Sequence, residues 1–510
     1  MDSLARFSAR SGHLKRELGK RRTKRHPPSP EGNNPLTRRA DPDCEPADPA
    51  NTVTDRLNTL LRNGGPGYTL RLCPNERYMI QAPITFAHPN QEISTLGYPI
   101  DDERAVLVVS GPVQNGEGHT VAVDGTCNDC DGVKLRNIQI DGDRGNAPPT
   151  KGGGNIEMGG DNSNQLIEYV RTYNPRSWTC LHIAEGPLSC NNVTIQYNDI
   201  GPCGVDTFQE WADGISLACR NSLVKENLIF DATDGGIVVF GSPGSVIEDN
   251  TIWVANTMLL GGINIVDYNP FEGDYRGTVV RRNNIIGGFA NDGQEPGDTH
   301  GFNNETAIIK IGIGIGPRTW FGDRYGESRN NGGMVTSNTF SGAFSYAIAI
   351  TSANNFTVLD NKLVGNTAFI GARGPNCSDS DHVPEPAPFI VDWATVGTDM
   401  NKGSGKVQDD FVGISDGDSL TCVLPPNGGD FWPFGTNPGN TAEEAFSDKN
   451  KDDEGGSPVG IVVGVVIGII ALGVILFFAR KWYMRKMEEK RCFEASRQMA
   501  QKRAYTQQLP

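Results

Sequence analysis

Two aspartates and a lysine in the middle of the chain have the residue types and spacing that acid–base chemistry needs. Asp213 and Asp234 stand 21 residues apart, and each precedes a glycine. Lys310 lies between two isoleucines farther along the chain. Two carboxyl groups can supply a general acid and a base or nucleophile, and a lysine can hold a substrate carboxylate. We therefore take these three as candidate catalytic residues; the alternative is that each aspartate binds the amides of its own turn.

The elements that must position these groups are short strands with one outward position each. Two apolar residues flank that position, and the alternation of side chains along a strand puts it on the opposite face. Stacked strands lie about 4.8 Å apart, so outward groups of neighbouring coils can act together. A solvated sheet face is the alternative. The outward positions, in chain order, are Glu157, His182, Ser216, Val238, Asn264, Lys310 and Ala349.

A second class of strand alternates with the first and is marked by asparagine. The shortest interval between these asparagines is 23 residues. A repeat in this range predicts a solenoid, in which each unit buries its apolar face against its neighbours. We expect each asparagine to take the left-handed backbone of a corner and to bond to the amide stacked on it. The marked positions are Asn137, Asn198, Asn227, Asn250, Asn283, Asn338 and Asn361, and Val170 replaces asparagine in a weaker copy.

These features make the chain resemble the right-handed parallel β-helix superfamily of pectate lyases and polygalacturonases. The resemblance implies an all-β, right-handed parallel β-helix solenoid that acts on cell-wall or extracellular polysaccharide. Asp213 and Asp234 are similar to the Asn-Thr-Asp-Gly and Asp-Asp strand starts of polygalacturonases, where the aspartates supply the general acid and activate water. This chain has Trp211 and Ala212 where that family has Asn and Thr. The family's Gly-His-Gly and Arg-Ile-Lys motifs are not found in this chain.

A lyase or epimerase is an alternative to a hydrolase. Such an enzyme must hold a uronate carboxylate with a cation and remove a proton with a base. Lys310, Arg276 or Arg318 would serve as the cation, or calcium bound by aspartates would replace it. No residue spacing fixes the cofactor, so calcium stays open.

Two insertions, residues 267–277 and 314–333, leave the predicted strands at the same corner of successive coils. We expect them to stack into one wall beside the outward groups. Aromatic and arginine side chains on a wall suit a sugar chain, and long loops on a rigid scaffold often carry sites. The alternative is that the aromatic residues only pack the loops down. The candidate substrate-binding residues are His182, Asn264, Asp267, Tyr275, Arg276, Arg318, Trp320 and Arg324.

The remaining segments divide the chain into five parts. A short amphipathic helix over residues 51–63 is expected to cap the first coil. The parts are a basic, disordered N-terminus at 1–40, a β-helix ectodomain at 41–426 with core coils at 133–373, an acidic Gly/Pro-rich stalk at 427–458, a transmembrane helix at 459–479, and a basic cytosolic tail at 480–510.

The transmembrane helix begins at Val459 and ends at Ala479, and none of its 21 residues is charged. That length is sufficient to cross a bilayer. Basic residues follow it directly and acidic residues precede it, so the C-terminus is expected in the cytosol and the body outside the cell or in a lumen. The N-terminus shows no apolar signal-peptide segment.

Net charge and cysteine content limit the partners and the cellular compartment that fit the chain. The formal net charge is −15, and both ends are basic, so the body between them is strongly acidic. This argues against a nucleic-acid partner, and it disfavours a polyanionic glycan unless calcium or a basic patch intervenes. Ten of the 11 cysteines precede residue 423, which favours an oxidising compartment.

The positions of the cysteines and of the asparagines in glycosylation sequons also favour an oxidising compartment. We expect Cys180, Cys190, Cys203 and Cys219 to pair across neighbouring coils, and Cys377 to pair with Cys422; the alternative is that they are buried free thiols. Cys127 and Cys130 form a Cys-x-x-Cys motif without the partners that zinc requires. Four glycosylation sequons begin at Asn192, Asn304, Asn355 and Asn376.

Two functions fit the sequence. The first is a membrane-anchored enzyme acting on polysaccharide, of the lyase, hydrolase or epimerase class. The second is a non-catalytic surface protein on the same scaffold that binds glycan or serves in adhesion or sensing. The sequence leaves the glycan, the catalytic status and the type of membrane open.

Overall fold

The computed structural model describes residues 43–423 apart from 206, 208, 209, 256, 269, 289–306, 371–380 and 401–405. The predicted disordered N-terminus, stalk, transmembrane helix and cytosolic tail lie outside these residues. Among the helices that are described, none has both the length and the apolar character to cross a bilayer.

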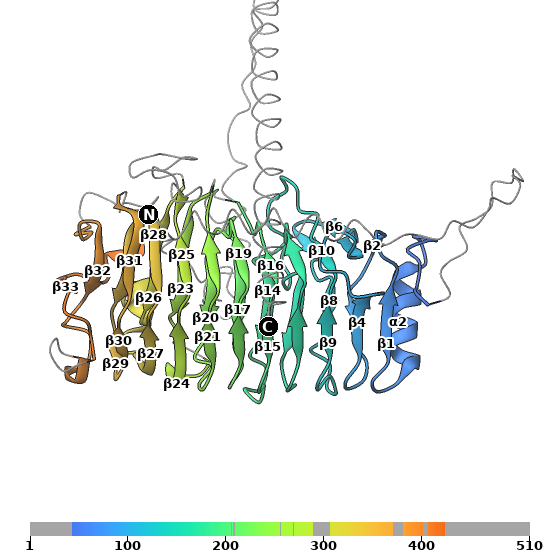
Figure 1. Cartoon of the computed structure of the whole chain (residues 1–510), viewed down its shortest axis with the longest axis horizontal. Helices are drawn as coiled ribbons and strands as arrows, with labels where there is room; N and C mark the ends of the chain where they lie inside the picture. The colour runs from blue at the N-terminus through green and yellow to red at the C-terminus, as the bar shows by residue number, and fades with distance from the viewer. Residues whose placement is uncertain are drawn as a thin grey trace, which may run out of the picture. The chain divides into compact units, whose positions relative to one another are not determined.

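The described chain winds into a parallel β-helix with three columns of strands (Figure 1). Sheet A contains β1 (Thr69–Leu72), β4 (Glu92–Thr95), β9 (Lys134–Arg136), β12 (Leu166–Glu168), β15 (Thr194–Gln196), β18 (Leu223–Lys225), β21 (Val246–Glu248), β24 (Asp274–Arg281), β27 (Asn330–Thr336), β29 (Ala353–Asn354) and β30 (Thr357–Leu359). All of its strand pairs are parallel.

The larger sheet contains the other two columns, which we call B1 and B2. Column B1 is formed by β2 (Arg77–Ile80), β5 (Val106–Val109), β10 (Gln139–Asp141), β13 (Arg171–Tyr173), β16 (Asp199–Ile200), β19 (Leu228–Phe230), β22 (Thr251–Trp253), β25 (Asn284–Ile286), the first half of β28 (Thr339–Ile350) and β31 (Lys362–Phe369).

Column B2 is formed by β3 (Ile84–Thr85), β8 (Val123–Asp124), β11 (Ile156–Gly159), β14 (Thr179–Ala184), β17 (Asp213–Leu217), β20 (Gly235–Val239), β23 (Leu259–Ile265), β26 (Ile309–Ile315), the second half of β28, β32 (Ala387–Val391) and β33 (Val412–Gly413). The long strand β28 pairs with both columns and so joins them. Beside the helix lies an antiparallel pair, β6 (Val113–Gln114) and β7 (Glu117–Gly118).

Each coil passes through sheet A, then B1, then B2. The sequence predicted two alternating strand classes, and the structure divides the asparagine-marked class into the strands of sheet A and B1. The asparagine marks the corner between them. The parallel β-helix is therefore confirmed, whereas its right-handed sense stays a prediction based on the general preference of parallel crossovers.

An asparagine ladder runs along that corner. Each side-chain amide from Asn198 to Asn338 donates to the amide oxygen of the next asparagine, at 2.8–3.0 Å, and the ladder ends at Asn361. The same oxygen also accepts a backbone N–H from the preceding coil, as in Asn227 to Asn250 at 3.0 Å. The predicted stacking is therefore confirmed for six asparagines. A buried amide with every hydrogen bond satisfied fixes the register of successive coils.

The predicted backbone role of these asparagines was wrong. The left-handed residue is the one before the asparagine, for example Glu226 with φ 52° and Asp249 with φ 56°. Asn137 is the exception, since it has φ 50° itself. It occupies the corner position that Glu226 and Asp249 occupy in their coils, one residue before the ladder position. In the ladder asparagines the amide bonds, and not tolerance of a left-handed backbone, explain the residue type.

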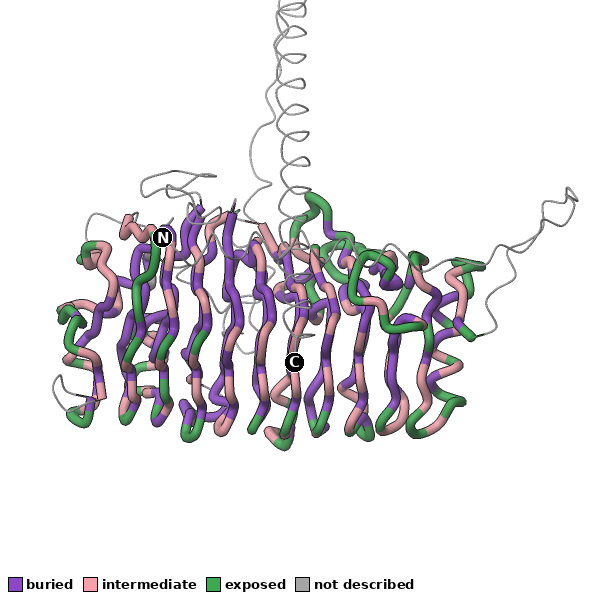
Figure 2. The backbone as a smooth tube through the Cα atoms, in the orientation of Figure 1, coloured by how far each residue is buried: buried purple, intermediate pink, exposed green. Residues whose placement is uncertain are grey.

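Helix α2 (Val53–Gly64) covers the N-terminal end of the stack, where Figure 1 shows it beside β1. Val53, Leu57 and Leu61 are buried on one face of it, and Gly65 follows with φ 71°. The predicted cap is therefore confirmed. At the opposite end residues 406–408 lie on β30, and Gln408 accepts the backbone N–H of Asn361 at 3.1 Å. The coils begin at β1, earlier than the predicted core coils. Figure 2 shows buried backbone running through every coil, with exposed segments mainly at the turns.

The remaining helical segments lie late in the chain. They are α3 (Pro317–Phe321), η2 (Gly322–Tyr325), η3 (Thr398–Met400) and α4 (Leu420–Val423). Two of them belong to the second predicted insertion, which is therefore partly helical and not an extended loop.

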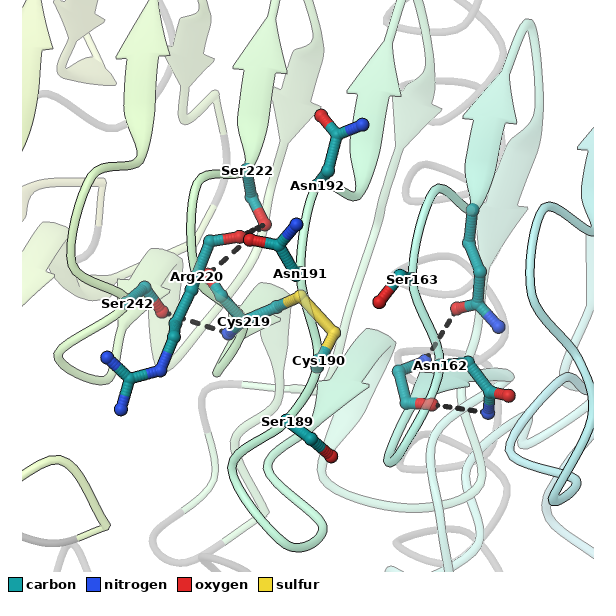
Figure 3. The surroundings of a disulfide bond; sticks show 12 residues. Asn162, Ser163, Ser189, Cys190, Asn191, Asn192, Cys219, Arg220, Ser222 and Ser242 are labelled. Atoms are coloured by element: carbon teal, nitrogen blue, oxygen red, sulfur yellow. Dashed lines mark hydrogen bonds between the residues drawn. A yellow bond between two sulfur atoms is a disulfide. The ribbon is translucent and has the colours of Figure 1, made fainter.

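Two disulfides join successive coils, and their four cysteines are buried in the core of the stack. Cys180–Cys203 and Cys190–Cys219 confirm the predicted pairing across coils, and Figure 3 shows the second of them. Cys127–Cys130 and Cys44–Cys73 are also bonded. Cys422 is disulfide-bonded, but Cys377 lies outside the described residues, so that pairing stays a prediction.

Candidate functional site

The outward residues of column B2 form a continuous row. Strand registers place Glu157, His182, Ser216, Val238 and Asn264 on successive coils. The stacking predicted from the sequence is confirmed for these five positions. Because the side chains share one face of one sheet, their polar groups lie within reach of their neighbours.

Lys310 does not belong to this row. Gly314 stands opposite Asn264, and Ala349 stands opposite Gly314. Lys310 lies four residues earlier on β26 and is buried, with 1% of its surface exposed. The predicted position was wrong because β26 has isoleucine at every second residue, so several registers fit the same alternation.

Asp213 and Asp234 form a buried acidic pair at the start of two neighbouring B2 strands. Asp213 is fully buried; its carboxylate accepts the Ser216 hydroxyl at 2.7 Å and the Gly235 N–H at 2.7 Å. Asp234 is half-buried, and its Oδ1 has no hydrogen-bond partner. The register places Gly235, not Asp234, on Asp213, so the one-residue offset between the two aspartates persists in the structure.

Burial makes both groups weak acids. Burial raises the pKa of Asp234 to about 7. Burial, and then the charge of Asp234, raise the pKa of Asp213 well above its usual range, partly opposed by the bonds from Ser216 and Gly235. Two carboxyl groups that share a low-dielectric site lose their protons in steps that belong to the pair. The pair therefore retains a proton close to neutral pH.

Asn264 completes the row on the side of the acidic pair. Its side chain is fully buried, and neither amide atom has a hydrogen-bond partner. It lies over Gly235 and Gly261, where an added Cβ would approach its amide to 3.0 Å and 2.1 Å. Buried amides without partners are costly and uncommon in folded proteins. This amide can donate and accept hydrogen bonds beside the carboxyl pair.

His182 lies in an acidic group at the other end of the row. Its Nδ1 is 2.7 Å from the Glu157 carboxylate, and its Nε2 is 3.9 Å from Glu185. Burial lowers the pKa of His182, but the charge and hydrogen bond of Glu157 and the charge of Glu185 outweigh it, so the pKa is raised. The half-buried Trp178 ring packs edge-on against the imidazole, with centroids 4.9 Å apart. The group combines a histidine placed between two carboxylates with an aromatic ring.

The first predicted insertion does not carry its side chains to the site. Tyr275 is fully buried in the core, where its hydroxyl bonds to the Val239 carbonyl. Arg276 belongs to β24 of sheet A, on a different column, and pairs with Asp274 at 2.8 Å. Asp267 is buried and accepts the Gly273 N–H at 2.7 Å, which closes its own loop. Their expected place in a wall beside B2 was wrong because the chain turns into sheet A at Asp274.

The two insertions do meet, through aromatic side chains. Tyr268 and Tyr325 are stacked with centroids 3.6 Å apart, and Phe321 packs edge-on against both. Trp320 is fully buried in the apolar cluster on the outer face of B2. This agrees with the alternative in which the aromatic residues pack the loops down.

The arginines of the second insertion lie away from the acidic pair. Arg318 makes two bonds of 2.9 Å to Asp418. It lines a depression of about 210 Å³ together with Arg329, Ser352 and Thr395. Arg324 is half-buried, with its guanidinium carbon 5.5 Å from the Tyr325 ring. The structure therefore does not bring Arg318 or Arg324 together with Asp213 and His182.

The outer face of B2 changes character along the stack. From Val238 onward an apolar cluster occupies it, including Leu260, Ile311, Tyr346 and Ile390. The polar side chains are gathered from Glu157 to Asn264. The candidate site is therefore this polar part of the row, comprising Glu157, Trp178, His182, Glu185, Asp213, Ser216, Asp234 and Asn264.

Four of these residues were missing from the predicted catalytic and binding residues, namely Glu157, Trp178, Glu185 and Ser216, and no sequence signal marked Trp178. Glu157 and Ser216 were visible as outward positions, and stacking with His182 and Asp213 was the signal for their role. Glu185 stands three residues after His182, and a carboxylate at that spacing was the available signal. Within the described ranges, no group of three or more His, Cys, Asp and Glu side chains is arranged to hold a metal ion. Calcium binding stays a prediction.

Comparisons with known proteins add only distant likenesses. No protein-family model and no curated protein sequence matches the chain. Among solved structures, the Azotobacter vinelandii mannuronan C-5 epimerase AlgE6 A-module is 14% identical, with 62% of this chain and 95% of that chain covered and a TM-score of 0.37. DFA-IIIase from Arthrobacter chlorophenolicus A6 in complex with GF2 is 15% identical, covering 72% and 95%, with a TM-score of 0.40. Alginate lyase from Paenibacillus sp. is 12% identical, covering 64% and 96%, with a TM-score of 0.31. At these scores the likeness carries no argument about function.

Proposed function

We propose that this β-helix protein acts on a neutral glycan by acid–base catalysis at the polar part of the B2 row. The observation that carries the proposal is the Asp213–Asp234 pair, which retains a proton near neutral pH. Cleavage of a glycosidic bond requires one protonated and one ionised carboxyl group. Asp213, which is held by Ser216 and Gly235, and the partly exposed Asp234 supply the protonated and the ionised group between them.

Charge supports a neutral substrate over a polyuronate. Glu157, Glu185 and the acidic pair lie on one face, and the chain as a whole carries −15. Like charges at a binding face oppose a polyanion. The arginines that would hold uronate carboxylates lie elsewhere. Trp178 offers its half-buried ring to a sugar, and the unpaired amide of the buried Asn264 lies beside the carboxyl pair.

The cellular setting belongs to the same proposal. We place the β-helix outside the cell or in a lumen, held by the apolar segment 459–479 with the basic tail in the cytosol. Disulfides between coils are consistent with an oxidising compartment. The membrane segment itself rests on the sequence.

The test is glycan turnover by the purified full-length chain. We expect shortening of a neutral glycan and no change in polyuronates, measured by released reducing ends and by absorbance of unsaturated products. Asp213→Asn and Asp234→Asn are each expected to lower turnover by roughly 100-fold or more, the usual contribution of a general acid or base. Asp360→Asn, the same change at an exposed corner of sheet A, is the matched control and should leave turnover unaltered.

A non-catalytic glycan-binding protein is the second candidate. The observation that favours it is the complete burial of Asp213, Ser216 and Asn264. Binding to immobilised neutral glycan without turnover, retained by both aspartate variants, would establish this function and reject the enzyme.

A further inference from the structure

Each coil enters sheet A through a left-handed corner two residues before the strand. Glycine occupies many of these corners, and asparagine occupies five of them. These asparagines are Asn90, Asn164, Asn192, Asn221 and Asn355, with φ between 51° and 62°. All five are exposed, and in each case the next residue is buried. The corner therefore presents the asparagine side chain on the outside of the stack.

Only two of the five corners also have threonine at the first position of the strand. Asn192-Val193-Thr194 begins β15, and Asn355-Phe356-Thr357 begins β30. Asparagine, any residue except proline, then serine or threonine is the acceptor sequence for an N-linked glycan. We propose that Asn192 and Asn355 carry N-linked glycans. The proposal depends on the outward or lumenal orientation proposed above, and it is independent of catalysis.

Existing hydrogen bonds leave room for this modification. The Asn192 Nδ2 donates to the Asn164 Oδ1 at 2.7 Å, which uses one of its two hydrogens. The Asn355 Oδ1 accepts from the Lys406 Nζ, which leaves Nδ2 as the atom to be modified. A glycan therefore replaces a hydrogen without removing the amide from either contact.

The reaction balances with a lipid pyrophosphate-linked oligosaccharide as donor. The asparagine Nδ2 loses one proton and forms a bond to C1 of the first sugar. The bond between C1 and the pyrophosphate oxygen breaks, and the lipid pyrophosphate leaves with that electron pair. No oxidation or reduction is involved.

The two positions lie at corners through which the chain enters sheet A, and neither is an outward residue of B2. Figure 3 shows Asn192 near the Cys190–Cys219 disulfide with its side chain directed away from the sulfur atoms. The modification is thus compatible with glycan binding at the candidate site.

The chain offers a matched test at a third corner. Asn221-Ser222-Leu223 has the same exposed, buried and half-buried order as Asn192-Val193-Thr194, and Leu223 stands directly opposite Thr194. It lacks only the threonine. Leu223→Thr is therefore expected to create a new glycan on Asn221, whereas Thr194→Val and Thr357→Val each remove one glycan while retaining the left-handed asparagine.

The experiment expresses the full chain and these variants in a eukaryotic secretory host. Mass spectrometry of peptides after enzymatic N-glycan removal reports each asparagine by its conversion to aspartate. We expect Asn192 and Asn355 modified in the natural chain and Asn221 unmodified, with Asn221 modified in Leu223→Thr. Unmodified Asn192 and Asn355 would overturn the proposal, and an unmodified Asn221 in secreted Leu223→Thr would overturn the role of corner geometry. Turnover by the same preparations tests the proposed enzyme separately.

Discussion

Asp213 and Asp234 share a buried environment but differ in their hydrogen bonds. Asp213 accepts from Ser216 and Gly235, whereas the Asp234 Oδ1 has no partner. Donors favour the ionised form of a carboxyl group, and burial without donors favours the protonated form. The hydrogen bonds favour ionisation of Asp213 and the charge of Asp234 opposes it, so we assign the retained proton to the pair.

This assignment predicts a stability that falls as pH rises. Because the folded-state pKa of Asp234 is about 7 and an unfolded aspartate titrates near 3.9, the folded chain binds more protons between these values. The contribution of Asp234 is present at pH 4 and is lost as pH rises through about 7. Asp234→Asn should therefore match the natural chain at pH 4 and exceed its free energy of unfolding at pH 8 by on the order of 2 kcal/mol. Urea unfolding at the two pH values measures this, and equal stability at pH 8 would contradict it.

His182 and Glu157 predict a slope of the same sign for a different reason. The raised pKa of His182 means that its charged form is stabilised in the fold, so the contribution is present below the unfolded pKa of about 6.5 and is lost as pH rises through the folded pKa. Glu157→Gln removes the charged partner and should lower the free energy of unfolding at pH 5.5 by about 1.5–3 kcal/mol. The histidine should also titrate at lower pH in the variant, as followed by NMR. An unchanged titration would show that the 2.7 Å contact does not set the histidine pKa.

At the scale of the element, sequence alone located the asparagine ladder but not the strand registers around Lys310. An asparagine that returns beside an apolar pair leaves one arrangement in which its amides meet. In β26 the isoleucines at 309, 311, 313 and 315 alternate with other residues, and a shift by two leaves the pattern unaltered. Only the partner strands decide which residue faces Asn264. The predicted positions of Tyr275 and Arg276 were wrong for a related reason. The sequence did not mark where the insertion turns into sheet A.

The hydrogen bonds of the asparagine ladder predict how much it contributes to the free energy of unfolding. The buried Asn338 accepts two bonds from Asn283 and donates to Asn361 at 3.0 Å and to the Val280 carbonyl at 3.1 Å. Asn338→Ala leaves several of these groups buried without partners, at about 1–3 kcal/mol each. We expect a loss of about 3 kcal/mol or more in the free energy of unfolding, measured with urea.

The neighbouring residue provides the control. Ser337 has φ 57°, where glycine is accommodated without a Cβ clash, so Ser337→Gly should change stability by less than about 1 kcal/mol. Comparable losses in the two variants would show that the corner backbone, and not the amide ladder, supports this coil.

At the scale of the whole molecule, three columns of strands explain why the polar groups gather where they do. One coil contributes one residue to each outward row, so groups 22 to 34 residues apart in sequence become neighbours. The apolar cluster over the later B2 strands leaves only the row from Glu157 to Asn264 for polar chemistry. The sequence predicted the stacking principle, but burial of the later positions depended on the loops and C-terminal segment that pack over them.

The last prediction concerns attachment of the body to a membrane. Residues 459–479 contain no charge. A helix of 21 residues, at 1.5 Å per residue, would span roughly the 30 Å hydrocarbon core. The full chain should therefore sediment with membranes and resist alkaline carbonate, whereas a chain lacking 459–479 should be released. Deletion of 427–447, which has the same length but is polar, is the matched control and should remain bound. Because basic residues flank the segment on its C-terminal side, protease added from the lumenal or outer side should cut the stalk and free the β-helix while leaving the tail protected. Recovery of the full chain in the soluble fraction, or protection of the β-helix in place of the tail, would contradict the topology.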